Sequence, residues 1–120
     1  RAAYDEAMSL LDRLPPDRQV KVLRHRIFLE RYASKHQNED LAGEAAAAPN
    51  DPRAHYRYGL LLAAQERYEE ALEELLTSVR LNRSWEDGAA RKGMLAIFEL
   101  LGMDAPLTRE YQRKLENVLF

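Results

Sequence analysis

The chain contains no cysteine, which excludes a disulfide, a thiolate nucleophile and a cysteine-ligated metal. It also has no apolar run that approaches the roughly 18 residues of a membrane span. Charge of one sign is not in excess, since 18 lysines and arginines stand against 20 aspartates and glutamates. A nucleic-acid-binding domain would carry a basic stripe, so the charge balance gives no support to that function.

Catalytic motifs are missing as well. The sequence has no glycine-rich phosphate loop, no H-E-x-x-H zinc motif and no G-x-S-x-G nucleophile motif. The histidines His25, His36 and His55 are not spaced from one another, or from carboxylates, as zinc ligands are. The glutamates within residues 69–74 are expected to form a solvated helical face beside no cleft. We therefore expect a protein that is not an enzyme and that needs no cofactor or metal.

Apolar residues recur at helical spacing along nearly the whole chain. They make up 46% of it beside 32% charged residues, a balance that is ordinary for a soluble helical domain. Their separation by three and four residues predicts helices. The predicted fold is all-α, with antiparallel helical hairpins stacked as a short solenoid of about seven helices. These helices are expected over residues 2–14, 17–35, 39–48, 52–65, 68–81, 85–101 and 104–119.

The stretch from Asn50 to Arg83 has the length of a tetratricopeptide repeat, a helical hairpin with a period of about 34 residues. Counted from Pro52, the small residues of that motif fall at Gly59 and Ala71, where two helix backbones approach closely. The aromatic residue on the turn side is Tyr68. This stretch therefore resembles a tetratricopeptide repeat, and we expect it to be the central hairpin of the fold.

The rest of the motif is matched less completely. Leu62 and Leu75 fall where it has large apolar residues. His55 replaces the usual tryptophan, Ser78 replaces a small apolar residue, and Arg83 stands where proline is common. A generic helical hairpin is therefore the alternative interpretation.

Around the central hairpin we expect a single domain with four parts. They are the second helix of a truncated repeat, a shortened repeat, the central repeat and a C-terminal helical pair, over residues 1–14, 16–48, 51–83 and 84–120. A truncated solenoid exposes an apolar edge at its cut, so self-association of the chain through the first helix is also possible.

Helix ends are indicated by capping residues. Asp51 is placed to cap a helix that begins at Pro52. The run 84–87 resembles a capping box, which predicts that the next helix begins at Trp85. Gly102 is expected to end that helix in a left-handed conformation.

A concave face is the expected binding surface, because the first helices of stacked repeats line it. Clamps for a C-terminal carboxylate use Lys and Asn there, whereas this chain has Tyr56 and Leu60. We therefore expect the face to bind apolar polypeptide segments. Its predicted residues on the central hairpin are Arg53, Tyr56, Leu60, Ala63 and Ala64, and Arg24 and Phe28 extend it onto the preceding helix.

Basic residues occupy much of the remaining surface of the helix over residues 17–35. They either form a solvated face or make a docking surface for an acidic partner. They are Arg18, Lys21, Arg24, Arg26 and Arg31.

The second half of the chain resembles one family in particular. The elements that carry the resemblance are RYEEALEELL, the W-x-D-G-x-A-R-K of residues 85–92, the FELLG of residues 98–102 and the terminal EYQRKLENVLF. They are similar to the C-terminal tetratricopeptide region of bacterial thioredoxin-like chaperedoxins (the YbbN/CnoX type). Residues 1–48 match this region in helix layout only.

The resemblance implies a protein–protein interaction module of a cytoplasmic co-chaperone. A thioredoxin-like domain would precede Arg1 and would carry any redox chemistry. Family members hold unfolded clients and pass them to DnaK and GroEL-type chaperones, which would be the partners. The apolar end Val118, Leu119 and Phe120 either covers the core or docks to such a partner. The alternative function is a structural or self-associating region that supports the preceding domain.

Overall fold

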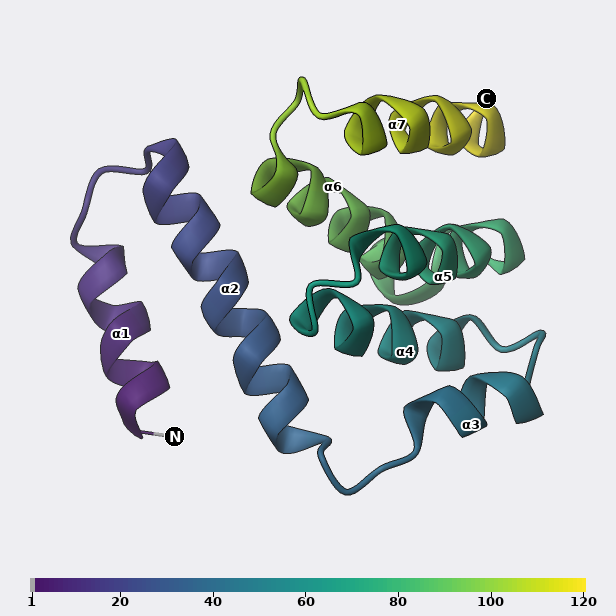
Figure 1. Ribbon diagram of the computed structural model, residues 1–120, viewed down its shortest axis with the longest axis horizontal. Helices are drawn as coiled ribbons and strands as arrows, with labels where there is room; N and C mark the ends of the chain where they lie inside the picture. Colours follow the sequence, from purple (N-terminus) through teal and green to yellow (C-terminus); the bar gives the residue numbers. More distant parts are fainter. Residues whose placement is uncertain (1) are drawn as a thin grey trace.

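The computed structural model describes residues 2–120, and Arg1, where the predicted N-terminal segment begins, lies outside them. Over the described residues the chain forms seven α-helices, one 3-10 turn and no strand (Figure 1). The all-α fold of about seven helices is therefore confirmed. The helices are α1 (Ala2–Asp12), α2 (Arg18–Lys35), α3 (Leu41–Ala47), α4 (Pro52–Ala64), α5 (Tyr68–Leu81), α6 (Ala89–Leu101) and α7 (Pro106–Leu119).

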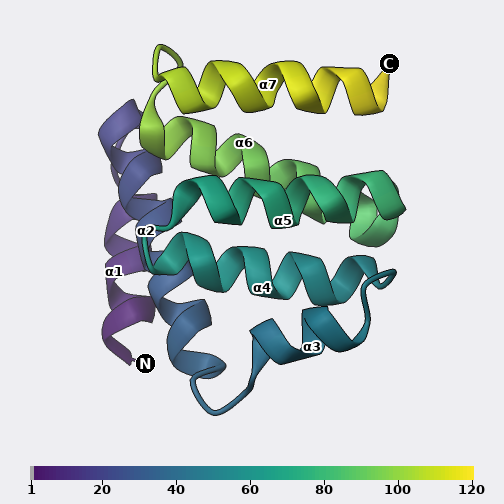
Figure 2. The ribbon, with the colours of Figure 1, turned by 45° about the vertical axis from the view of Figure 1, so that its right-hand side comes forward.

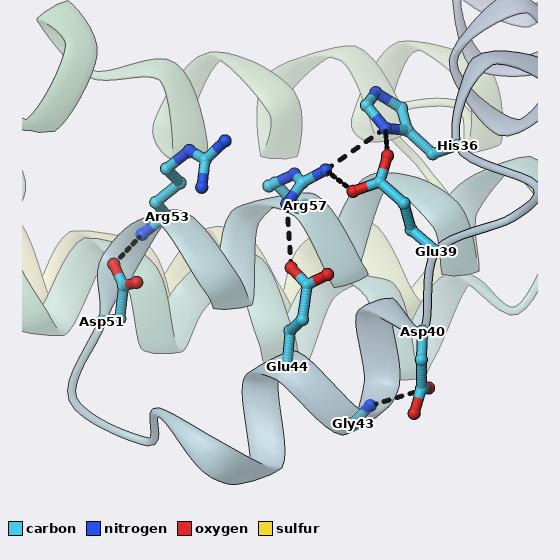
Figure 3. A network of polar contacts seen from close by, with 8 residues as sticks. All are labelled: His36, Glu39, Asp40, Gly43, Glu44, Asp51, Arg53 and Arg57. Carbon is cyan, nitrogen blue, oxygen red and sulfur yellow. Dashed lines mark hydrogen bonds and ion pairs between the residues drawn. The ribbon is translucent and has the colours of Figure 1, made fainter.

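Three helices begin at an aspartate that caps them. The side chain of Asp17 accepts a hydrogen bond from the backbone N–H of Val20, and Asp51 accepts one from that of Arg53, each at 2.9 Å. The second cap confirms the predicted start of α4. Asp40 caps α3 in the same way and was not predicted (Figure 3).

The hairpin of α4 and α5 is built around a close backbone contact. A Cβ placed on Gly59 would lie 2.9 Å from Cγ of Leu75 and 3.3 Å from the carbonyl oxygen of Ala71. Only glycine fits there without a shift of α5, as the repeat pattern predicts. The hydroxyl of Ser78, which is fully buried, donates a hydrogen bond to the carbonyl oxygen of Pro52 at 2.8 Å. This departure from the motif therefore joins the end of α5 to the start of α4.

The segment between α5 and α6 differs from the prediction. Ser84 makes no side-chain capping bond, and Trp85–Asp87 forms a 3-10 turn. Glu86, Asp87 and Gly88 all have positive φ, at 48°, 57° and 77°, so the backbone turns sharply before α6 begins at Ala89. The predicted capping box is therefore wrong. The glycine in the left-handed conformation, which suits that geometry, sets the start of the helix.

Two of the glutamates expected to be solvated join helices instead. Glu73 of α5 accepts a hydrogen bond from the hydroxyl of Tyr111 in α7 at 2.5 Å. Glu74 of α5 pairs with the ring of His55 in α4 at 2.7 Å. Tyr111 is one of the largest fully buried side chains, so its hydroxyl needs a partner within the protein.

The four helices α4 to α7 form a stack, and α2 runs crosswise along one side of it (Figure 2). Helix α2 packs on both α4 and α6, while α1 packs on α2 and α3 packs on α4. The predicted shortened repeat over residues 16–48 is thus not a closely packed hairpin, because α2 and α3 pack on α4 rather than on each other. The placement of α2 defines the site described next.

Candidate functional site

A pocket of about 280 Å³ lies where α2, α4 and α6 meet. Its floor is formed by Tyr56 and Leu60 of α4, and Phe28 of α2 forms one wall. The opposite wall is α6, which presents Ala89, Gly93 and other small residues toward the pocket. Ala89, Gly93 and Ala96 leave space between α2 and α6 that larger residues at these positions would fill, and Lys92 and Ile97 border the same space.

A second, more open pocket continues the first toward the start of α4. The two pockets share Tyr56, Glu86 and Ala89, and the second also reaches Arg53 and Trp85. The rings of Tyr56 and Trp85 pack at a centroid distance of 5.2 Å. Together the pockets form one depression, here called the α2–α6 groove.

Some charged side chains along the groove are paired, such as that of Arg57, whereas three others are not. Within residues 2–120, the side chains of Arg53, Lys92 and Glu86 take part in no ion pair or hydrogen bond of the structure. Burial raises the pKa of Tyr56, so its hydroxyl stays neutral and can donate or accept a hydrogen bond. The groove therefore offers apolar and aromatic surface with free charges beside it.

One end of the groove is held in place by Arg57 of α4 (Figure 3). The side chain of Arg57 is only 11% exposed. Its guanidinium pairs with Glu39 at 2.5 Å and with Glu44 of α3 at 2.8 Å. The hydrogen bonds from His36 and then Arg57 lower the pKa of Glu39, which keeps this carboxylate charged. The turn between α2 and α3 is thereby fixed onto α4.

The structure brings four of the predicted binding residues together. Arg53, Tyr56, Leu60 and Phe28 all line the α2–α6 groove. Their place supports the prediction of a concave binding surface. Leu60 is only 3% exposed, however, so it contributes to the floor of the groove and not to its rim.

The other predicted residues of the face lie elsewhere. Ala63 is 1% exposed, and Ala63 and Ala64 border a small cavity of about 40 Å³ with Leu29 of α2. Ala63 is covered by α2, and the partly exposed Ala64 lies beside this cavity and not in the groove, so the prediction that the two residues form one open surface with Tyr56 is wrong. Arg24 pairs with Asp12 at the end of α1 and does not line the groove.

Three of the five basic residues named on α2, Lys21, Arg24 and Arg31, lie beside carboxylates of the chain. Arg31 pairs with Asp5 at 2.8 Å, and Arg18 donates a hydrogen bond to the carbonyl oxygen of Glu99 at 3.2 Å. Lys21 lies 4.0 Å from the Glu99 carboxylate. Pairing of this kind leaves little excess charge for an acidic partner, so a solvated face is the better interpretation.

The C-terminal end divides into two parts. Val118 and Leu119 are partly buried and pack against the core. Arg83 donates a hydrogen bond to the carbonyl oxygen of Leu119 at 2.8 Å. Phe120 is fully exposed. Of the predicted docking residues, only Phe120 is therefore free to meet a partner without a change in the core.

Sequence reasoning missed the residues of α6 that form the groove. Ala89, Gly93 and Ala96 follow one another at i, i+4 and i+7, so they share one helix face. That spacing of small residues was a usable signal. The start of α6 itself was predicted four residues too early, at Trp85 instead of Ala89.

No group of three or more histidine, aspartate or glutamate side chains within residues 2–120 is arranged to hold a metal ion. Over the same residues, no helix combines the length and the apolar character that crossing a bilayer requires.

The geometry agrees with a comparison of the sequence with known families. The family model described as Tetratricopeptide repeat matches residues 31–120, which include α3 to α7 and the last residues of α2. Neither a curated protein nor a solved structure matches the chain. Since the family model covers most of its length, the chain belongs to the tetratricopeptide-repeat family.

Proposed function

We propose that this domain binds other polypeptides through the α2–α6 groove. Tetratricopeptide repeats generally mediate protein–protein interaction and are typically not catalytic. The proposal therefore concerns which surface binds and what kind of segment it takes. A groove on the face formed by the first helices of two repeats, α4 and α6, is the natural place for a bound chain.

The observation that carries the proposal is the exposure of Phe28. Its side chain is 49% exposed while it borders a pocket floored by Tyr56 and Leu60. A large aromatic ring left beside an apolar pocket is typical of a binding surface. At about 280 Å³ the pocket has room for a few side chains of a segment and not for a folded domain.

The groove suits apolar segments of unfolded proteins. Its lining is mostly apolar, and shape alone does not select one sequence. We propose on this basis that the domain holds unfolded clients as part of a cytoplasmic thioredoxin-like co-chaperone. GroEL-type chaperonin or the DnaK system would be the receiving partners, as the resemblance of residues 51–120 implies.

The test compares two side chains of α2 that are equally exposed. Phe28 lines the groove, whereas Leu23, at 48% exposure, lies outside it. We expect Phe28→Ser to reduce severalfold the suppression of citrate synthase aggregation after dilution from guanidinium chloride. Leu23→Ser is the matched control and should leave suppression unchanged. Equal activity of Phe28→Ser and the unaltered protein, with both folded, would refute binding at the groove.

A second function is favoured by a different surface. Leu10 and Leu14 of the N-terminal segment are 60% and 51% exposed, and Leu23 of α2 is exposed as well. These residues can mediate self-association or contact with a neighbouring domain. Light scattering on the chain and on a Leu10→Ser variant tests this: loss of a dimer in the variant would support the structural function.

Docking to a chaperonin is tested at Phe120. Deletion of Val118 to Phe120 would also remove side chains that pack against the core, so the single exposed residue is the cleaner target. If the end docks, Phe120→Ser should abolish the capture of GroEL-type chaperonin by the chain. Met103→Ser, another exposed apolar residue at 57%, serves as control. Capture that survives Phe120→Ser would remove this residue from the interface.

A further inference from the structure

We propose that the surface beneath α2 is a binding site for an amphipathic helix, and that α2 is its replaceable occupant. The surface consists of Leu60 and Ala63 of α4 with Ile97 and Glu99 of α6. The partner is then a helix that presents an aliphatic side chain where Leu29 lies and a cation where His25 lies. The proposal goes beyond the function proposed above and does not require it, because it assigns a different class of partner to the surface that α2 covers.

Helix α2 has the position of a ligand. It packs on α4 and on α6, the first helices of two successive repeats, and runs crosswise along one side of the stack (Figure 2). It does not pair with α3 as the first helix of a repeat pairs with its second. Most of α2 also precedes Arg31, where the repeat region begins. The stack of α4 to α7 is therefore a repeat core to which α2 is added.

Few apolar side chains attach α2 to that core. Of its 18 residues only Val20 and Leu29 are buried, whereas six of the 14 residues of α5 are buried. Leu29 belongs to the same apolar cluster as Leu60 and Ala63. One buried leucine and partly exposed residues such as Tyr32 hold α2 less firmly than α4, α6 and α7 hold α5.

The remaining attachments are polar and lie near the surface. His25 Nε2 lies 2.7 Å from Oε1 of Glu99, and their side chains are 27% and 40% exposed. Lys21 and Arg18 approach the same residue, through its carboxylate and its carbonyl oxygen. Water can replace partners at such exposed positions at little cost, and a cation of another helix can replace His25.

A pivot for the movement exists at the other end of α2. The turn over residues 36–40 is held onto α4 by the pairs of Arg57 with Glu39 and Glu44 (Figure 3). Helix α1 packs on α2 and can move with it. Opening at Glu99 therefore releases α1 and α2 together and leaves the repeat core in place. Opening would expose Leu29, Leu60 and Ala63, which are buried in the structure, so the closed state is favoured when no partner is bound.

Hydrogen exchange of the whole chain tests whether α2 opens by itself. We expect amides of residues 18–35 to exchange through an opening of lower free energy than amides of residues 68–81. Glu99→Gln should raise exchange in α2 by roughly two- to fivefold, the loss expected for a partly exposed ion pair, without effect on α5. Glu110→Gln is the matched control, because Glu110 pairs within its own helix with Lys114. If the amides of α2 and α5 exchange through one common opening in the unaltered protein and in both variants, the proposal is overturned.

A peptide with the sequence of residues 18–35 tests the site itself. We expect the labelled peptide to bind saturably to the whole chain carrying Leu29→Ala, in which the resident α2 is weakened and the site is intact. The same peptide with Leu29→Ala should bind at least about tenfold more weakly, as the loss of a buried leucine implies. Absence of binding to the folded Leu29→Ala chain would refute a helix site. If that chain does not fold, His25→Ala replaces it, because this change removes the resident contact to Glu99 and leaves the site intact.

The two proposals can fail separately. If Phe28→Ser abolishes client holding while α2 opens only with the whole domain, the groove binds polypeptides and α2 is a fixed part of its wall. If α2 exchanges and binds in trans while Phe28→Ser holds clients normally, the helix site is real and the groove is not the client surface.

Discussion

Helices α5 and α2 both carry a wide apolar face and both pack on α4, yet they are buried to different extents. In α5 the face is enclosed by α4, α6 and α7, and Leu72, Leu75 and Leu76 are fully buried. In α2 the comparable face leaves Leu23 and Phe28 about half exposed. The pattern of apolar residues thus shows that each segment is a helix with one apolar side, and the packing decides how much of that side is covered.

The two helices are consequently stabilised by different interactions. Complete burial of a leucine contributes about 1.5–3 kcal/mol, whereas an exposed ion pair contributes about 0–1 kcal/mol. Helix α5 has several such leucines, and α2 depends on Leu29 with a set of surface pairs at Glu99. The central hairpin is therefore the stable scaffold, and α2 is the part of the molecule that can respond to a partner.

The largest expected effect compares a leucine from each helix. Leu72→Ala should lower the free energy of unfolding by about 2–5 kcal/mol, because Leu72 is fully buried and the change leaves a cavity. Leu23→Ala should change it by less than about 0.5 kcal/mol, because Leu23 is 48% exposed. Urea unfolding followed by circular dichroism measures both. Similar losses in the two variants would show that α2 is as much a part of the core as α5.

A medium effect compares two glycines that face the same leucine. Gly59→Ala should destabilise the protein by about 1–2 kcal/mol, because overpacking against Leu75 exceeds the gain in helix propensity. At Gly93 an added Cβ would lie 3.4 Å from Leu75 and 3.8 Å from Leu60, which is ordinary contact. Gly93→Ala should therefore stabilise the helix by up to about 1 kcal/mol while it narrows the groove.

Thermal unfolding of both glycine variants provides the measurement. If Gly59→Ala is as stable as Gly93→Ala, the close approach of α4 and α5 does not require a glycine. The structural account of the repeat motif would then need revision at this position.

The sequence was sufficient to predict the central hairpin because its determinants are local. The spacing of Gly59 and Ala71 encodes the contact between two helices that are joined by a tight turn, and the predicted α5 agrees with the observed bounds. Asp51 and Pro52 likewise act on the helix that they begin. Such features depend on residues that lie near one another in the chain, and a single sequence shows their spacing.

The groove depends on contacts that a single sequence does not display. The pair of His25 with Glu99 joins residues 74 positions apart, and it fixes where α2 crosses α6. The start of α6 was misplaced because two local signals compete over residues 84–88, the apparent capping box and the left-handed glycine. Since the crossing of α2 and the start of α6 together set the groove, only its α4 residues and Phe28 were predictable.

The smallest expected effect concerns a histidine that joins the two helices of the central hairpin. Nδ1 of His55 lies 2.7 Å from a carboxylate oxygen of Glu74, and Nε2 lies 2.8 Å from the carbonyl oxygen of Pro49. Burial disfavours the charged ring, but the hydrogen bonds to Glu74 and Pro49 outweigh it and raise the pKa of His55 above 6.5. Two acceptors facing one ring are both satisfied only when the ring carries two protons.

The pH dependence follows from that direction. A raised pKa means that the folded protein holds the proton more tightly than the unfolded chain, so the stabilisation is complete below pH 6.5. It is lost as the pH rises through the pKa of the folded state. Urea midpoints between pH 6 and pH 9 should therefore fall more steeply for the unaltered protein than for His55→Gln, which cannot titrate. Parallel pH profiles would show that His55 is not the linked group, and the central hairpin would then differ from α2 in apolar burial alone.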